Sequence, residues 1–437
     1  MGIPETFTVN DAIEHAGYGP FQWFLSVLCG FAWMADSMEI MLISLLPSAF
    51  ACEWGVSVYG QGLMIASSAG CLFGCASSLS TSFTMFVVIR GMVGAAIGGV
   101  PQTSTLVAEF LPSSRRATGM AMLTIFFAAG ATLECVVALL IMPRWGWRAL
   151  IVASSISLGL FTVASAIWLP ESPRFFVSRR QTERATAVLE RVCKSNGATM
   201  PSGTLVPEHD AKETQTSIIS LFSEKLIRTT SLLLVVWFVA GFGSIGVTMS
   251  TPALLKKTAA CHNGGNDTSS LSNSTSPKAC IPFTSQDYWD LITTSSAEIP
   301  ALLIIIAIVP RIGRKFCLST AAAIYAATNF ALSIHCLPRF LVVGLLFIAR
   351  AMLSAVYTTV FIFTAELYPT PFRATGLGMS AMAGRVGAMI SPVVSQVLIA
   401  SSPSLATAIY GAAGVVGAVI PHFFPFETRG RQLKDSL

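Results

Sequence analysis

Long apolar runs separated by shorter polar breaks dominate this sequence. A membrane-spanning helix needs about 20 predominantly apolar residues, and the runs reach that length without the alternation that marks strands. A weaker run, residues 61–80, is rich in Gly, Ala, Ser and Cys. The stronger runs fall near residues 23–49, 82–111, 117–142, 147–169, 229–250, 285–309, 316–336, 339–366, 374–400 and 405–426.

The composition supports the same class of protein. Of the 437 residues, 53% are hydrophobic and 11% are charged, which is too little polar surface to cover a soluble domain of this size. The first 22 residues contain no Lys or Arg, and the first apolar run is too long for a signal peptide. The sequence therefore predicts an all-α, multi-pass membrane protein of the plasma membrane or an intracellular vesicle membrane.

Two long polar loops predict the orientation. The loop at 171–228 holds nine Lys and Arg residues, which the positive-inside rule assigns to the cytoplasm. The loop at 251–284 carries N-glycosylation sequons at Asn266 and Asn273, which suit the lumen or the cell exterior. We expect both asparagines to be glycosylated on the side opposite the basic loop.

Most of the positive charge follows this topology. Counted with that orientation, most of the 27 Lys and Arg residues lie in cytoplasmic segments, and Arg90, Arg350 and Arg385 lie inside apolar runs. No basic patch is left for nucleic acid, so we expect none as a partner. We expect a monomer in the lipid bilayer.

The ten cysteines are scattered and show neither a zinc spacing nor a secreted disulfide framework. We therefore expect no metal site and no cofactor. In the outer loop, Cys261 and Cys280 flank both sequons, and an oxidising compartment would join them in a disulfide. Cys52, on the same predicted side, is a competing partner.

A motif occurs twice at an offset of 257 residues. The segment Ala-Glu-Phe-Leu-Pro at 108–112 recurs as Ala-Glu-Leu-Tyr-Pro at 365–369, and each copy is followed by Arg-Ala-Thr-Gly. Both copies end an apolar run with a Glu seven residues before an Arg, and these residues are Glu109 with Arg116 and Glu366 with Arg373. Two homologous halves are typical of transporters built from repeats.

The repeat divides the chain into three parts. These are an N-terminal helical bundle at 1–170, the cytoplasmic loop at 171–228, and a C-terminal six-helix bundle at 229–437 that includes the outer loop.

Several motifs together resemble the major facilitator superfamily, within its sugar and organic-ion porter branches. They are the paired Glu-Arg segments, Arg-Ile-Gly-Arg-Lys at 311–315, Pro-Glu-Ser-Pro-Arg-Phe at 170–175 and Pro-Phe-Glu-Thr-Arg-Gly at 425–430. Trp-Met-Ala-Asp at 33–36 and Gly-Gly-Val-Pro-Gln at 98–102 are similar to the synaptic-vesicle-protein-two-related group. The resemblance implies twelve spans, two six-helix bundles and a central substrate cavity.

The first half departs from this pattern. The second half uses residues 285–336 for two spans joined by a basic loop, whereas the corresponding part of the first half offers only 61–80 and no Gly-Arg-Lys sequence. We expect about one span to be missing, with a junction near 75–76. The remaining chain would cross the membrane ten times with its N-terminus inside, or eleven times with its N-terminus outside.

Ionisable residues inside spans are functional candidates, because each costs about 2.5–3.5 kcal/mol to insert. Asp36 and Glu39 lie three residues apart on one helical face. They are predicted either to bind a cationic substrate or a coupling proton, or to be paired or capped within the protein. Arg385 resembles the arginine that anion carriers hold, and the alternative is a pair with Glu134 or Glu298. Tyr357, Trp237 and Trp33 are more typical of a core than of a ligand site.

The remaining charged candidates are predicted to be gate elements. We expect Arg90 and Arg350 to bond helix ends and Glu109 or Glu366. Arg311, Gly313 and Arg314 would form a tight turn with cationic contacts to a neighbouring helix C-terminus.

We therefore predict a transporter, and not an enzyme, that moves a small organic ion by alternating access. An anion or zwitterion moved with a proton is favoured over a cation. The alternatives are a non-transporting ligand-binding or trafficking protein of vesicle membranes, or an inactive isoform that lacks the missing span.

Overall fold

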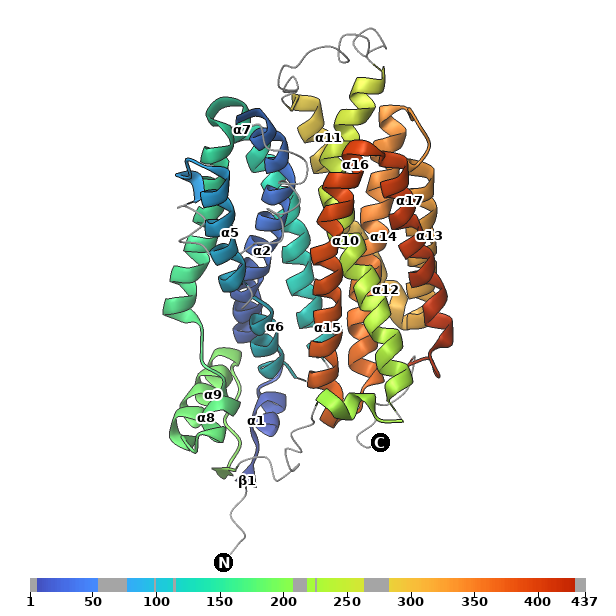
Figure 1. Cartoon of the computed structure of the whole chain (residues 1–437). Coiled ribbons are helices and arrows are strands. Elements are labelled where there is room, and N and C mark those ends of the chain that lie inside the picture. The colour runs from blue at the N-terminus through green and yellow to red at the C-terminus, as the bar shows by residue number, and fades with distance from the viewer. Residues whose placement is uncertain are drawn as a thin grey trace, which may run out of the picture.

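The computed structural model describes residues 6–53, 77–97, 100–112, 115–206, 218–224, 226–262 and 283–428. It is almost entirely helical, and its helices form two bundles that stand side by side (Figure 1). Most of the run 61–80, the junction near 75–76, and the loop residues Asn266, Asn273 and Cys280 lie outside the described residues. Among those described, seven helices are long and apolar enough to cross a membrane.

The first bundle is built from four described helices. They are α2 (Pro20–Glu53), α5 (Phe83–Ile97), α6 (Val100–Glu109) and α7 (Arg116–Trp168). Inside α7, Gly146 has φ +72°, which only glycine adopts readily, and there the chain turns back at the top of the bundle (Figure 1). The two limbs of α7 therefore correspond to the separate spans predicted at 117–142 and 147–169.

The second bundle contains helices that match the six predicted runs. They are α10 (Ile227–His262), α11 (Ser285–Ser296), α12 (Glu298–Ile312), α13 (Arg314–Leu332), α14 (Arg339–Leu367), α15 (Thr370–Pro392), η3 (Val393–Leu398), α16 (Ile399–Ser401), α17 (Pro403–Val419) and η4 (Ile420–Phe423). The helices α11 and α12 together fill the run 285–309, because Ala297 between them keeps helical dihedral angles.

A small domain lies below the first bundle, at the end that we call cytoplasmic because it carries most of the basic loop (Figure 1). It comprises β1 (Thr6–Phe7), α1 (Val9–Ala16), α8 (Pro173–Ser178), α9 (Thr182–Asn196) and β2 (Thr204–Leu205), and η2 (Ile218–Phe222) follows it. The strands pair in parallel. Thr8 caps α1, and its hydrogen bonds hold the pKa of the Asp11 carboxyl below the usual range.

The last residue of α9 fastens this domain to the first span. The Asn196 amide nitrogen donates to the carbonyl oxygens of Ala16 and Gly17 at 3.1 and 3.2 Å, and to Gln22 Oε1 at 2.8 Å. The backbone N–H of Phe21 donates to Asn196 Oδ1 at 3.1 Å. Two of these hydrogen bonds reach the end of α1 and the turn after it, and two reach the start of α2, the helix that carries Asp36.

The apolar core shows which end of the molecule is closed. One cluster joins residues of both bundles near the opposite, outer end, among them Leu46, Phe86 and Leu254. Toward the cytoplasmic end the two bundles have separate clusters, one around Leu25 and Phe110 and the other around Trp237, Phe363 and neighbouring residues. The bundles therefore pack together at their outer ends.

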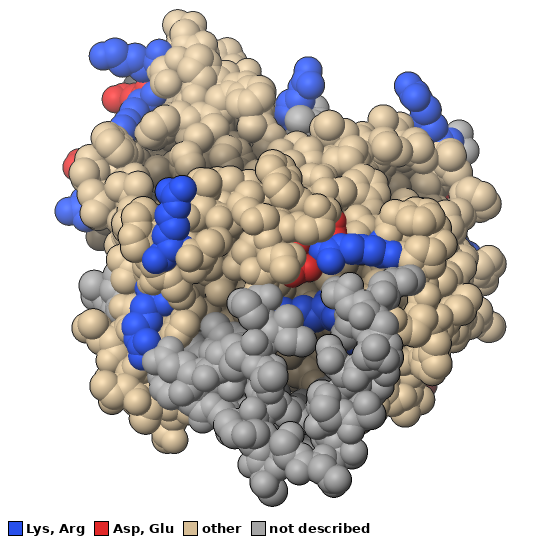
Figure 2. All heavy atoms as spheres, turned by 90° about the horizontal axis from the view of Figure 1, so that it is seen from above, with Lys and Arg blue, Asp and Glu red and all other residues tan. Residues whose placement is uncertain are grey.

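Figure 2 shows Lys and Arg side chains spread over the outer end, with fewer Asp and Glu. Specific bonds hold the helices together there. Arg339, at the start of α14, bonds Asp287 and Asp290 of α11 at 2.7 and 2.6 Å. Cys261 forms a disulfide with Cys336, with 5.8 Å between the Cα atoms. The predicted pairing of Cys261 with Cys280 is wrong, because the fold brings the α13–α14 turn beside the end of α10.

Candidate substrate site

Three polar side chains from three helices meet between the bundles. Asp36 lies on α2, Tyr357 on α14 and Arg385 on α15, each near the middle of its span. Asp36 interacts electrostatically with Arg385, and Tyr357 interacts with both. The structure thus brings together an acid of the first half and a base of the second half.

These side chains face the interior and are still accessible to solvent. Tyr357 is 37% exposed, although its neighbours Val356 and Thr358 are buried. Arg385 is exposed and Asp36 is half-buried. Because the three interact across the two bundles, this exposure faces the space between the bundles and not the lipid.

Asp36 and Arg385 are not bonded to each other. Within the described part of the chain, neither has an ion-pair partner within 4.0 Å. An unpaired charge inside a membrane protein is costly. Asp36 and Arg385 are therefore the candidates for contact with a polar ligand.

Close helix contacts made by glycine position the site in each half. A Cβ on Gly130 of α7 would lie 2.3 Å from the Met34 carbonyl oxygen, two residues before Asp36. A Cβ on Gly241 of α10 would lie 2.0 Å from the carbonyl oxygen of Gly384, beside Arg385. Small residues let membrane helices approach this closely.

The aromatic ring of Trp237 packs against Tyr357. The buried Trp237 ring meets the Tyr357 ring edge-on, with 5.5 Å between centroids. Its indole N–H donates to Thr364 Oγ1 at 2.8 Å. Trp237 is thus a core residue, as the sequence favoured, and it orients Tyr357.

The acids near the site in the first half are engaged by protein groups. Arg90 forms a buried ion pair with Glu39, and its guanidinium lies 5.4 Å from the centroid of the Phe86 ring. Ser154 Oγ lies 2.8 and 2.9 Å from the two carboxylate oxygens of Glu134, and its hydroxyl can donate to either of them. We predicted that Arg90 bonds Glu109 or Glu366 at a helix end. This prediction is wrong, because Arg90 of α5 pairs with Glu39 of α2.

The second half contains a similar pair. Arg350 donates from Nη2 and Nε to Glu298 Oε1, at 2.6 and 3.1 Å. The predicted bond of Arg350 to Glu109 or Glu366 is therefore wrong. Within the described residues, no ion pair joins Arg385 to Glu134 or Glu298. Across the bundles, Cys135 Sγ lies 3.5 Å from Ser295 Oγ.

A network at the cytoplasmic ends of the second bundle contains the turn residues. Gly313, with φ +111°, begins α13, and the carboxylate of Glu427 accepts from the backbone N–H groups of Arg314 and Lys315, both at 2.9 Å. Arg314 bonds Glu366, near the end of α14, at 2.6 Å. Thr428 also donates to Glu366. This turn has the cationic contact with a helix end that the motif predicts.

The corresponding end of the first half is built differently. Glu109 accepts from Ser172, at the start of α8, and no arginine within the described residues pairs with it. Arg311 is exposed at the end of α12, and the side chain of Arg116 lies outside the described residues. Arg373 is half-buried near the start of α15.

Sequence reasoning missed Ser154, Ser295 and Asn196. Each is a small polar residue in a mostly apolar or amphipathic helix, and the sequence gives no sign of which partner it meets. Glu427 lay in a recognised motif, but its role as acceptor for the N-terminus of α13 depends on the fold.

Comparison with known proteins identifies the family. Residues 33–261 and 284–436 match the family described as sugar (and other) transporter. The interruption falls in the loop that carries Asn266 and Asn273, as expected for an insertion.

Relatives match along nearly the whole chain. The Caenorhabditis elegans protein svop-1 is 39% identical, covering 99% of this chain and 88% of its own. The synaptic vesicle 2-related protein of Xenopus laevis is 37% identical, covering 99% and 83%. The human protein SVOPL is 33% identical, covering 99% and 94%.

A solved structure has the same fold. The inward open form of the xylose transporter XylE from E. coli superimposes with a TM-score of 0.64 at 15% identity, covering 94% of this chain and 98% of that chain. Together with the repeated Glu-Arg motif and the two bundles, these matches show that this chain is an integral multi-pass membrane protein of the sugar (and other) transporter family, within the major facilitator superfamily.

Proposed function

We propose that this transporter moves a small organic anion or zwitterion together with a proton, and that Asp36, Tyr357 and Arg385 form its substrate site. The observation that carries the proposal is the opposition of Asp36 and Arg385 across the two bundles without an ion pair. Because the two groups belong to different halves, a ligand that bridges them would couple binding to rocking of the bundles.

The chemistry of the three side chains suits a substrate with a carboxylate. A guanidinium binds a carboxylate through two parallel hydrogen bonds, and the phenol of Tyr357 can donate a third. Asp36 can hold an ammonium group of a zwitterion, or a proton when the substrate is an anion. Both modes keep the net charge of the occupied site near zero, which lowers the cost of carrying it through the membrane.

The partners of the other acids support Asp36 as the proton carrier. Glu39 and Glu298 are bound by arginines, and Glu134 is bound by Ser154. Protonation of Glu39 or Glu298 would leave a buried guanidinium without its partner, which is strongly destabilising. Asp36 can gain or lose a proton without breaking an ion pair of the described structure.

We also propose the three-part organisation at 1–170, 171–228 and 229–437, with about one span absent near 75–76. The alignment with svop-1 runs over 462 positions, more than the 437 residues of this chain. The relative thus contains residues without a counterpart here, which supports a missing segment.

Uptake into proteoliposomes tests the substrate and its coupling. A panel of radiolabelled organic anions, zwitterions and cations is offered with and without an inward proton gradient. We expect saturable uptake of a carboxylate that the gradient accelerates. Arg385→Lys should reduce uptake at least tenfold, and Asp36→Asn should abolish its dependence on pH.

Matched variants on the cytoplasmic surface control for the chemical change alone. Arg191→Lys and Glu190→Gln alter exposed residues of α9 and should leave uptake unchanged. Uptake of a cation that is independent of pH and insensitive to Arg385→Lys would refute the proposal. Substrate binding without flux, with flux regained after restoration of the missing span, would identify an inactive isoform.

A further inference from the structure

Two arginines in the loop between α8 and α9 lie two and three residues before a threonine, the first residue of α9. The sequence is Arg179, Arg180, Gln181 and Thr182. This segment belongs to the part of the chain that the positive-inside rule assigns to the cytoplasm. Protein kinases select substrates partly by patterns of charge around the acceptor hydroxyl. Arginines at the second and third positions before a Ser or Thr match the preference of kinases with acidic substrate grooves.

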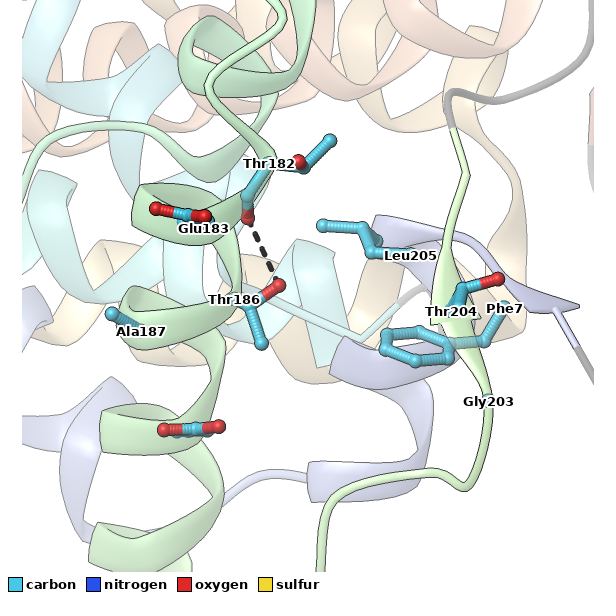
Figure 3. Close-up of a pocket in the computed structure, with 9 residues that line it drawn as sticks. Phe7, Thr182, Glu183, Thr186, Ala187, Gly203, Thr204 and Leu205 are labelled. Carbon is cyan, nitrogen blue, oxygen red and sulfur yellow. Dashed lines mark hydrogen bonds between the residues drawn. The ribbon is translucent and has the colours of Figure 1, made fainter.

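The Thr182 hydroxyl is accessible. The residue is exposed, and its side chain points into a cavity of about 410 Å³ between α9 and the strand β2, toward Leu205 (Figure 3). Among the described contacts, Thr182 takes part through its carbonyl oxygen, which accepts from Thr186 Oγ1 at 2.9 Å. Its own hydroxyl is free, whereas the hydroxyl of Thr186 on the same helix is already bonded.

The turn before α9 must open to fit a kinase active site. Gln181, the residue before α9, does not cap the backbone of the first turn with its side chain, whose Oε1 accepts from Arg184 Nη1 at 3.3 Å. Arg180 has φ +58°, a conformation that is uncommon and strained for a residue with a Cβ. An extended conformation of 179–182 would break the backbone hydrogen bonds from the N–H groups of Arg180 and Gln181 to the carbonyl oxygens of Val177 and Phe176, both 2.9 Å, and would release the Arg180 conformation.

We propose that Thr182 is a phosphorylation site for a basophilic protein kinase. Thr182 Oγ1 attacks the γ-phosphorus of ATP, a new O–P bond forms as the bond to the bridging oxygen of ADP breaks, and the hydroxyl proton passes to the kinase base. The product carries roughly two negative charges at pH 7.

The phosphate has local partners that would hold it. Arg180 and Arg184 have no acidic partner within 4.0 Å among the described residues, and the Arg179 guanidinium lies only over the Phe175 ring, 4.9 Å from its centroid. A phosphate beside an arginine cluster gains charge-assisted hydrogen bonds. The three arginines outnumber the two nearby acids, Glu183 and Glu190, so phosphorylation should order the α8–α9 loop.

The test uses the full chain in lipid nanodiscs, with labelled ATP and a kinase that prefers Arg at these two positions. Mass spectrometry should find the phosphate on Thr182 at near one per chain. Thr182→Ala should lose it, Thr186→Ala should keep it, and Arg179→Gln with Arg180→Gln should reduce its rate of incorporation at least tenfold. Phosphate on another residue, or none while a control peptide is fully labelled, would overturn the site.

Hydrogen exchange tests the structural consequence without relying on transport. Amides of residues 179–186 should exchange several-fold more slowly in the phosphorylated chain than in the unmodified chain, and Thr182→Ala treated with kinase should show no change. Unchanged or faster exchange in the phosphorylated chain would overturn the ordering of the loop.

Discussion

Asp36, Glu39, Glu134 and Glu298 are carboxylates of the spans that differ in how each is satisfied. Glu39 and Glu298 are held by arginines, and Glu134 accepts from the hydroxyl of Ser154. Asp36 faces Arg385 without bonding it. The ion pairs of Glu39 and Glu298 therefore stabilise the bundles, and our proposal assigns substrate and proton to Asp36.

Glu39→Gln should destabilise the first bundle. It leaves the Arg90 guanidinium, which is 1% exposed, without a counter-charge, and breaking a buried pair costs about 3–5 kcal/mol. The apparent melting temperature in detergent should fall clearly. The double variant Glu39→Leu with Arg90→Met should recover most of the loss, and simple additivity of the two changes would contradict a mutual pair.

The charged positions could be found from the sequence, but their partners could not. Arg90, Arg350 and Arg385 stood out because arginine is rare inside spans. Whether Arg90 meets Glu39 or Glu109 depends on which faces of α2 and α5 are in contact. That contact is set by packing between helices, which a single sequence does not encode locally.

Helix crossings in this fold depend on glycine. Gly241→Ala would place a methyl group 2.0 Å from the Gly384 carbonyl oxygen, so α10 and α15 must separate. Overpacking of this kind costs about 1–3 kcal/mol. Stability should fall, and affinity for substrate should fall with it because Arg385 is displaced.

Gly344→Ala is the matched control for this change. Gly344 lies in α14, and a Cβ there meets nothing within 4 Å. Alanine is favoured over glycine in a helix by about 1 kcal/mol, so this variant should be neutral or slightly more stable. Equal losses in both variants would show that backbone propensity and not the crossing is responsible.

The disulfide provides a second element-scale prediction. Peptide mapping without reduction should join the peptides that contain Cys261 and Cys336, and Cys280→Ser should not disturb this link. Cys336→Ser should lower stability by about 2–4 kcal/mol, since the bond closes a sequence separation of 75 residues. A link between Cys261 and Cys280 in the native protein would refute the assignment.

At the scale of the molecule, the repeated Glu-Arg motif allowed two bundles to be predicted, because each half copies the same helix ends. The small domain was less accessible to prediction. The charge of the basic loop predicted only its cytoplasmic location, whereas β1 pairs with β2 across about 200 residues of chain. Two-residue strands of this kind leave no periodic pattern.

The shared outer cluster should control the balance between conformations. Leu46→Ala removes buried contacts that exist while the outer ends are together, and a buried Leu→Ala change costs about 2–5 kcal/mol. A state with the outer ends apart should therefore become more populated. A Tyr357→Cys reporter should react several-fold faster with an impermeant thiol reagent added outside.

Leu25→Ala is the control for this experiment. Leu25 is as buried as Leu46, but its cluster lies within the first half and the small domain. It should lower stability without changing the outside reactivity of the reporter. Identical reactivity in both variants would show that the outer cluster does not set the balance.

The Cys261–Cys336 bond limits how the second bundle can move. It ties the end of α10 to the turn before α14, and Arg339 ties the start of α14 to α11. The outer ends of these helices therefore cannot move independently and form one rigid unit. Any opening toward the outside should therefore move these helices as a block relative to the first bundle.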